Sequence, residues 1–296
     1  MEFHGESKKF FTNKGIILKM FSKRNFFSFP TPGTSPGWVF ALILLLVSPP
    51  LLAQEQKKLK GDHFIVHYAG ALPDNEARTM LRRAEGYYNS IAEMVGYSRY
   101  SKYWTWDKRV TITVYPDAQT FTQNTGQPPW SQGTVERDWT PDHTKEIITF
   151  KQQANFFDGI LPHEISHLIL HDFIGVNVMV PRWFDEGVAQ MQEKEKRRIA
   201  KQLMTRLVSQ SKQPPLNVLM TMRLKGEQNQ TKIKIFYTQS LSVIDFLIVN
   251  YGSESFGNLC RNMRDGKSFE ASLTNAYPNI FSSLAELERK WAASFK

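Results

Sequence analysis

The sequence predicts an α+β fold in which a mixed α/β half, about residues 54–174, precedes a helical half, about residues 175–296. In the first half, short segments alternate between apolar and polar residues, as half-buried strands do. In the second half, apolar residues recur at the spacing of amphipathic helices. The 296 residues are 41% hydrophobic and 22% charged, which is ordinary for a globular protein.

The first 53 residues differ in composition from the rest of the sequence. They hold six basic and two acidic residues, then an uncharged run at 38–47 and a candidate cleavage site after Ala53. This order is typical of a secretory signal peptide. A membrane-spanning helix needs about 20 apolar residues, and Pro49 and Pro50 interrupt this run early. We therefore expect a signal peptide that meets the membrane only transiently and directs the protein to a periplasmic or extracellular location.

Two alternatives stay open at this end of the sequence. Residues 38–53 would hold the protein at the membrane as an anchor if they were not cleaved. The basic segment before them is unusually long, so Met20 is an alternative start.

The net charge and the cysteine content limit the partners and the disulfides that we expect. Without residues 1–53 the formal charge falls from +9 to +5, because that segment contributes six basic minus two acidic residues, or +4. No recognition motif accompanies this mild excess, so we expect no nucleic-acid partner. The densest basic cluster, at 193–201, includes acidic residues and is expected to be a solvated helix face. The single cysteine, Cys260, allows no intramolecular disulfide and is expected to be buried.

The first half is expected to contain one long helix and three strands. Asp74 or Asn75 is the candidate cap of a helix that reaches about Tyr97, with apolar residues at helical spacing. The strands are predicted at 64–68, 110–114 and 146–150. Residues 123–145 are rich in Gly, Pro, Asn, Gln and Trp and are expected to be mainly loop.

The second half is expected to be helical throughout. A helix that follows Pro181 is predicted to continue to about Leu207, and another is predicted at 236–250 with Gly252 as its cap. Residues 283–286 fit a capping box that opens a last helix, with Leu287 and Trp291 facing inward.

The segment His163-Glu164-Ile165-Ser166-His167 carries the strongest chemical signal, and Glu186 follows it after eighteen residues. Residues i and i+4 of a helix project from one face, so His163 and His167 can reach one metal ion. Glu164 lies about 100° round the helix, where its carboxylate can meet a water molecule bound to that metal. With Glu186 as third ligand, zinc keeps one open position, which is the arrangement of a catalytic site.

Two segments, HEISH at 163–167 and PRWFDEGVAQ at 181–190, resemble the gluzincin zinc metallopeptidases, most closely the peptidase MA-like family. That family's pattern is HExxH followed by Pro-x-Trp-x-x-Glu-Gly. The likeness extends to DHFIVHY, VTITVYPD and FYTQSLSVIDFLIVNYG, and so covers most of residues 60–296. It implies a zincin-like fold, a single catalytic domain at 54–296 with the active site between its two halves, and one Zn²⁺ per protein molecule. The metzincin pattern HExxHxxGxxH does not fit, because Leu170 and Phe173 stand where it needs Gly and His.

The resemblance also suggests roles for residues near the metal. Similar enzymes stabilise the oxyanion with a Tyr or His, for which Tyr237 is the first candidate, and Tyr251 and His143 are weaker ones. A Tyr237 that is merely packed is an equally open interpretation. The resemblance places Asp185 and Gln190 where the gluzincins orient the ligands, although Gln190 replaces a usual acid.

The positions of His171 and of the edge strand relative to the metal motif lead to two further expectations. His171 continues the i, i+4 series but lies about 12 Å along the axis from His163, so we expect it to be structural. Gluzincins add the substrate backbone to an edge strand, and residues 146–150 or 133–135 are the alternatives for that strand.

The sequence therefore predicts an exported zinc metallopeptidase that acts on peptides or proteins. The Gly-x-Met-Glu-Asn segment with which similar aminopeptidases bind a free amine is absent from the sequence, so we expect endopeptidase action. Two alternatives stay open: a catalytically idle zincin scaffold that binds peptide or cell-wall material, and a zinc hydrolase of non-peptide amides.

Overall fold

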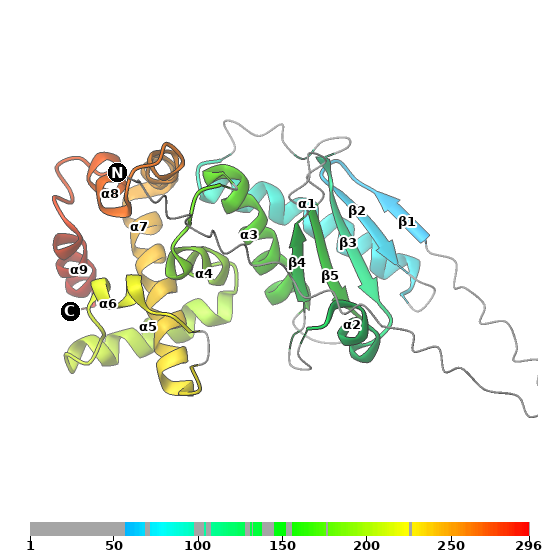
Figure 1. Cartoon of the computed structure of the whole chain (residues 1–296), viewed down its shortest axis with the longest axis horizontal. Coiled ribbons are helices and arrows are strands. Elements are labelled where there is room, and N and C mark those ends of the chain that lie inside the picture. The colour runs from blue at the N-terminus through cyan, green and yellow to red at the C-terminus, as the bar shows by residue number, and fades with distance from the viewer. Residues whose placement is uncertain are drawn as a thin grey trace, which may run out of the picture. The chain divides into compact units, whose positions relative to one another are not determined.

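One five-stranded sheet contains all the strands of the described residues, in the order β1-β2-β3-β5-β4 (Figure 1). β2 and β3 are parallel, as are β3 and β5, whereas β1 and β4 run antiparallel to their neighbours. The strands are β1 Lys57–Lys60, β2 Phe64–Tyr68, β3 Val110–Tyr115, β4 Gly133–Arg137 and β5 Lys145–Phe150. The three strands expected from the sequence are confirmed, β1 was not expected, and β4 contains the segment 133–135 that was one of the two alternatives for the edge strand.

The computed structural model describes residues 57–68, 72–97, 104, 108–127, 131, 133–137, 145–151, 156–175, 177–224 and 227–295. These residues belong to one compact unit, Leu52–Lys296. The predicted signal peptide and His143 lie outside them. The helices are α1 Asp74–Met94, α2 Ala118–Thr125, α3 Leu161–Ile174, α4 Arg182–Gln190, α5 Lys194–Ser209, α6 Leu216–Thr221, α7 Gln230–Arg264, α8 Phe269–Ala276 and α9 Leu284–Ala293. Strands and helices together make an α+β fold, as predicted.

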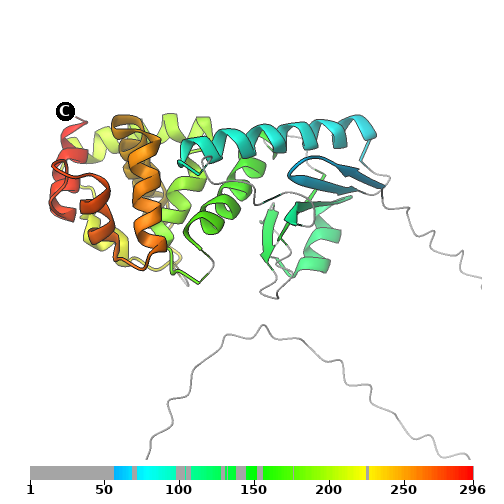
Figure 2. The ribbon, with the colours of Figure 1, turned by 90° about the horizontal axis from the view of Figure 1, so that it is seen from above.

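α1 connects the sheet to the later helices. It packs against β1 and β2 along one part of its length and against α3 and α7 along another (Figure 2). Its buried residues are mostly three or four positions apart, as the apolar pattern predicted. The predicted cap is wrong, because Pro73 precedes the helix and the Asp74 carboxylate instead accepts hydrogen bonds from Lys57 and Tyr68. The carboxylate is therefore used to tie the helix start to β1 and β2.

β4 forms the edge of the sheet beside β5, so the 133–135 segment rather than 146–150 is the edge strand. Residues 123–145 thus contain a strand and the end of α2, where mainly loop was expected. β4 pairs with a strand, β5, on one side only, and its sequence contains a glycine and polar residues. It therefore lacks the alternation of apolar residues by which a strand is predicted.

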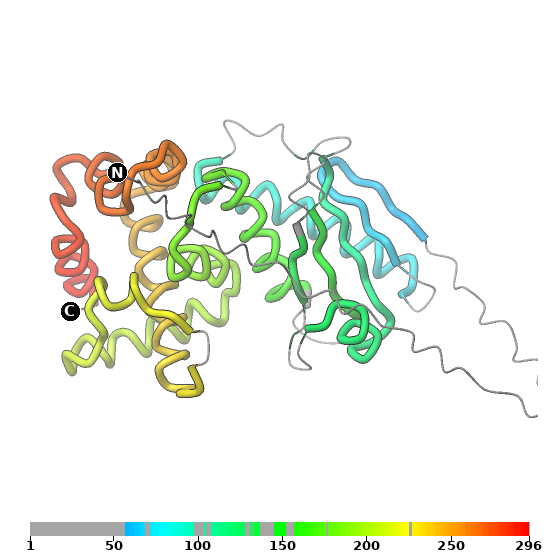
Figure 3. Tube along the Cα trace, viewed as in Figure 1, coloured from blue at the N-terminus to red at the C-terminus, as the bar shows by residue number. Residues whose placement is uncertain are grey.

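α7 is the central helix of the second half and contacts α3, α4, α5 and α8. The Cα trace in Figure 3 shows it running from beside α5 to beside α8. Gly252 has φ 84° and ψ 161°, so the helix is interrupted where its end was predicted, but it then resumes as far as Arg264. By length and composition α7 alone among the described helices is able to cross a membrane, yet 61% of its apolar stretch is buried inside the fold, as in a core helix.

The helix expected to run from Arg182 to about Leu207 is in fact two helices. α4 ends at Gln190, and α5 begins at Lys194. The break carries no Gly or Pro that would have signalled it. By contrast, α9 begins as predicted, with the Ser283 hydroxyl accepting a hydrogen bond from the backbone N–H of Glu286 at 3.2 Å and with Leu287 and Trp291 buried. Cys260 is also buried, as predicted.

Candidate metal centre

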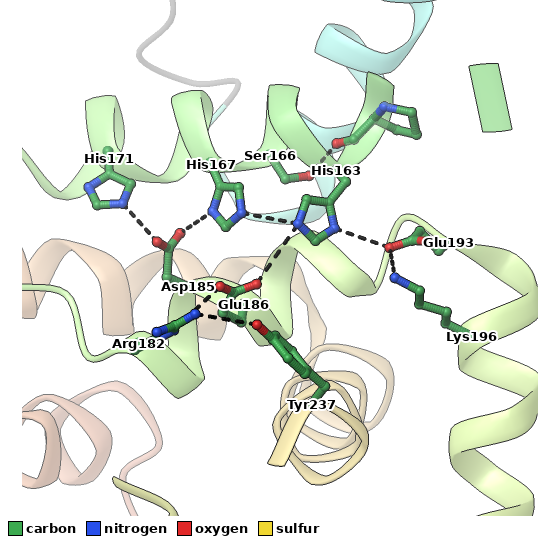
Figure 4. A network of polar contacts seen from close by, with 11 residues as sticks. His163, Ser166, His167, His171, Arg182, Asp185, Glu186, Glu193, Lys196 and Tyr237 are labelled. Carbon is green, nitrogen blue, oxygen red and sulfur yellow. Dashed lines mark hydrogen bonds and ion pairs between the residues drawn. The ribbon is translucent and has the colours of Figure 1, made fainter. Parts of the chain in front are cut away.

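α3 presents His163, Glu164 and His167 on the side of the helix that faces a pocket. A short π-helical turn, Phe156–Ile160, leads into this helix, and Pro162 occupies its first turn, where a missing N–H costs nothing. The opposite side of α3 is buried in the core. The Nε2 atoms of His163 and His167 lie 3.2 Å apart (Figure 4). The predicted i, i+4 arrangement is therefore present.

α4 brings Glu186 to these histidines. The Oε2 atom of Glu186 lies 3.9 Å from Nε2 of His163, and the ligand atoms of the three residues all lie within 4.8 Å of one another. Gly187 makes this possible, because a Cβ atom there would lie 2.6 Å from the Ile244 side chain and 2.7 Å from the Ser240 carbonyl oxygen on α7. The Glu-Gly pair thus lets α4 pack directly on α7.

This donor set fits a zinc ion. Each histidine has its Nδ1 atom against a carboxylate, which leaves the two Nε2 atoms facing each other. Two nitrogen ligands of tetrahedral zinc, each about 2.0–2.1 Å from the ion, are about 3.3 Å apart, close to the separation of these Nε2 atoms. Two imidazole nitrogens and one carboxylate are also the ligands of catalytic zinc sites that keep one position open.

Asp185 holds His167, as predicted, and it holds His171 as well. Its Oδ1 atom lies 2.7 Å from Nδ1 of His167, and its Oδ2 atom lies 3.0 Å from Nε2 of His171 (Figure 4). Burial lowers the pKa of His167, but the charge and hydrogen bond of Asp185, with the charges of Glu164 and Glu186, raise it to about 9. Burial raises the pKa of Asp185, but the two histidines hold it well below its usual range. Without a bound metal ion, His167 is therefore protonated at neutral pH.

His163 is held by Glu193, a residue that the sequence interpretation placed on a solvated helix face. Glu193 is only 9% exposed, and its Oε1 atom lies 3.1 Å from Nδ1 of His163 and 2.6 Å from Nζ of Lys196. Burial raises the pKa of its carboxyl group, but the contacts with His163 and Lys196 lower it overall. The expected partner, Gln190, is buried and lines the pocket without a hydrogen bond to either histidine among the described contacts. Glu193 lies in the break between α4 and α5, so no spacing within one helix signals its contact with His163.

The pocket in front of these residues has a volume of about 880 Å³. β4 forms one wall, where a Cβ atom on Gly133 would lie 3.9 Å from the Cγ atom of Glu164. α5 and α7 form the other wall. Glu164, the general base expected from the motif, therefore lines the same pocket as the candidate metal ligands and contacts the edge strand.

Tyr237 lines this pocket from α7, whereas Tyr251 does not. The Tyr237 hydroxyl accepts a hydrogen bond from Arg182 at 3.4 Å, and the Nε atom of Arg182 lies 3.6 Å from Glu186 (Figure 4). Burial raises the pKa of Tyr237, and the charge of Glu186 raises it further. Tyr251 packs against the rings of Phe246, Tyr277 and Phe281. The structure therefore brings the first of the candidate tyrosines, and not the second, to the pocket that holds the candidate metal ligands.

The comparison with known families agrees with this geometry. Residues 104–296 match the model of the peptidase MA superfamily. The match includes every residue that lines the pocket. No curated protein matches the sequence. Because the family match spans more than half of the sequence and contains both α3 and α4, the protein belongs to the peptidase MA superfamily.

Proposed function

We propose that this protein is an exported zinc-dependent endopeptidase. The observation that carries the proposal is the convergence of His163, His167 and Glu186 in one pocket, with a further carboxylate beside them. Membership of the peptidase MA superfamily supports a peptide or protein substrate.

One Zn²⁺ per molecule would be held by the two Nε2 atoms and the Glu186 carboxylate. When bound, zinc polarises a carbonyl oxygen and lowers the pKa of a coordinated water molecule. Asp185 and Glu193 keep the ring protons on Nδ1, so that both Nε2 lone pairs face the ion. The alternative of an idle scaffold does not explain why all the ligands and their supporting carboxylates are present together.

Glu164 would act as the general base and then as the general acid. Its carboxylate takes up the proton of the attacking water and delivers it to the leaving amine, a role that contributes about 10²–10⁴-fold. Glu164 lines the same pocket as the β4 residues Gly133, Thr134 and Val135, so a peptide bound in this pocket would contact both. The Tyr237 hydroxyl is the proposed donor to the oxyanion, and Arg182 beside it adds a positive charge.

β4 would bind the substrate backbone as an additional strand. An extended peptide that adds to a sheet edge forms main-chain hydrogen bonds and aligns its scissile bond without requiring a particular sequence. An edge strand accepts a peptide that continues past the site in both directions. This geometry, together with the missing amine-binding segment, supports endopeptidase action.

Zinc content is the first test. The purified protein is expected to hold one zinc ion by elemental analysis, and Glu186→Ala is expected to hold little after dialysis. Glu195→Ala is the matched control, because Glu195 is exposed and pairs only with Arg198 among the contacts of the described residues. No zinc in the unsubstituted protein, even after reconstitution, would support the idle scaffold instead.

Turnover is the second test. Glu164→Gln is expected to keep zinc and to lose about 10²–10⁴-fold in the hydrolysis of peptides. Unchanged hydrolysis would remove Glu164 from this role. A zinc-loaded protein that cleaves no peptide but cleaves small amides would identify the non-peptide hydrolase.

Export rests on residues 1–53 and has its own test. The protein recovered outside the cytoplasm is expected to begin at Gln54 when its N-terminus is sequenced. Recovery of the intact segment in the membrane fraction would instead support the anchored alternative.

A further inference from the structure

The two walls of the pocket differ in charge. The wall from the sheet half consists of Gln127 and the β4 residues Gly133, Thr134 and Val135, all of which are uncharged. The wall from the helical half carries three cationic side chains, Arg182, Lys196 and Lys234. Among the residues that line the pocket, the only carboxylates are Glu164 and Glu186, and the proposed chemistry uses both.

Lys196 on α5 and Lys234 on α7 line the part of the pocket formed by these two helices, which is called the groove below. Lys196, Ile199 and Ala200 are three and four residues apart, so they share one face of α5. Lys234, Thr238 and Leu241 share one face of α7 in the same way. The groove is therefore lined by apolar side chains, which include the exposed Ile199 and the buried Leu241, and by two cationic side chains.

Of the three cations, Lys234 is the one whose ammonium group is best placed to bind a carboxylate of a ligand. It is exposed, and it has no ion pair or hydrogen bond with any described residue. Lys196 contacts Glu193, but 47% of its side chain is exposed and its ammonium group has two further donors. Arg182 lies nearer the metal ligands, against Glu186 and Tyr237.

We infer that this groove binds a carboxylate of the substrate next to the scissile bond, with Lys234 as the main contact and Lys196 as the second. The inference rests on the proposed peptidase function and names its substrate class, which is acidic peptides. This combination of apolar and cationic side chains suits a glutamate, whose methylene groups would contact Ile199 and Leu241 while its carboxylate binds the ammonium groups. The free C-terminus of a peptide has the same chemistry and is the other source of such a carboxylate.

Defined peptides separate these sources. The set consists of acetylated hexapeptides that are otherwise alanine, in which a single Glu, Gln or Lys is moved through the positions, each made with an amidated and with a free C-terminus. Hydrolysis by the zinc-loaded full-length protein is followed by mass spectrometry. We expect one position relative to the cleaved bond at which Glu is favoured over Gln by about tenfold in kcat/KM, and Lys is disfavoured. A preference for the free C-terminus at every position would identify the peptide terminus as the carboxylate, and equal rates for Glu, Gln and Lys would overturn the inference.

Variants of Lys234 test the assigned residue. Lys234→Gln is expected to reduce the preference for Glu over Gln by about threefold to fivefold, and Lys234→Glu is expected to reverse it in favour of Lys peptides. Lys232→Gln is the matched control, because it removes the same charge from the same turn of α7 but does not line the pocket. A preference that persists in both Lys234 variants would contradict the assignment.

A binding measurement keeps the inference separate from the proposed function. The same peptides are titrated into zinc-loaded Glu164→Gln, in which hydrolysis is expected to be lost, and the Kd values of the Glu and Gln peptides are compared. Tighter binding of the Glu peptides that disappears in Glu164→Gln/Lys234→Gln would support the groove even if the unsubstituted protein cleaved none of them. In that case the proposed peptidase function fails while the carboxylate site stands. Equal Kd values would overturn the carboxylate site and leave the peptidase function to be judged on hydrolysis alone.

Discussion

The two sides of the metal centre hold their histidines differently. On the His167 side, Asp185 belongs to α4, directly precedes Glu186 and bridges two histidines. On the His163 side, Glu193 comes from the break between α4 and α5, holds one histidine and shares its oxygen with Lys196. Asp185 is held by the same turn of α4 that carries Glu186, whereas the position of Glu193 depends on how α4 and α5 meet. We therefore expect the His167 side to be the more rigid and the more important for the metal.

Moving α4 should disrupt both sides at once and have the largest effect. In Gly187→Ala, the new Cβ atom would meet the Ser240 carbonyl oxygen, which cannot rotate away, so α4 must shift with Asp185 and Glu186. Such overpacking costs about 1–3 kcal/mol of unfolding free energy, and we expect zinc affinity to fall more than about 100-fold. Denaturation of the metal-free protein and chelator competition measure the two effects.

Gly86→Ala is the matched control for this substitution. Gly86 is an exposed residue within α1, and a Cβ atom there would meet nothing within 4 Å. Alanine favours a helix over glycine by about 0.5–1 kcal/mol, so this variant should be slightly stabilised with unchanged zinc affinity. Equal behaviour of the two variants would show that α4 does not need its close contact with α7.

Removing the Asp185 charge should break the His167 side alone. In Asp185→Asn, the amide can contact His167 but no longer attracts its Nδ1 proton or bridges to His171 as an anion. Loss of such a supporting carboxylate typically lowers metal affinity by about 10–100-fold, and we expect that range here. Asp158→Asn is the control, since Asp158 is exposed on the π-helical turn and pairs with Arg83 away from the ligands. Unchanged zinc affinity in Asp185→Asn would remove the distinction between the two sides.

The difference between Asp185 and Glu193 also shows which parts of the site could be predicted from the sequence and which could not. His163, Glu164 and His167 come together through spacing within two turns of one helix, so local rules suffice for them, whereas Glu186 was expected from the second motif and Asp185 from the resemblance to the gluzincins. Glu193 was missed because the break at 191–193, which places it between α4 and α5, has no Gly or Pro to mark it. β1 was missed for a similar reason, because Lys57–Lys60 is rich in charge and becomes a strand by pairing with β2. Sequence reasoning thus missed the contacts that depend on how two elements pack and that no motif marks.

The pH dependence of zinc binding should sharpen the comparison. The pKa of His167 is raised to about 9 in the metal-free site, so at neutral pH a proton must leave Nε2 before zinc binds. Zinc affinity should therefore fall about tenfold for each pH unit below 9, until the proton uptake of other groups intervenes. Chelator competition from pH 7 to pH 9, corrected for protonation of the chelator, measures this slope. Asp185→Asn should flatten the slope, since the anion that raises the pKa of His167 is gone, and a slope that persists in this variant would exclude Asp185 as its cause.

Glu193→Gln should give the smallest loss of zinc affinity, about threefold to tenfold, although Glu193 touches a ligand as directly as Asp185 does. The amide oxygen can still accept the Nδ1 proton of His163, no second histidine depends on it, and Lys196 is free to turn to solvent. Glu195→Gln serves as the control, because it removes one negative charge from the same end of α5 without contacting a histidine. Chelator competition at one pH compares the three variants directly. A loss as large as that of Asp185→Asn would mean that the helix break is as rigid as α4 itself, and the His163 side would then be as essential to the metal centre as the His167 side.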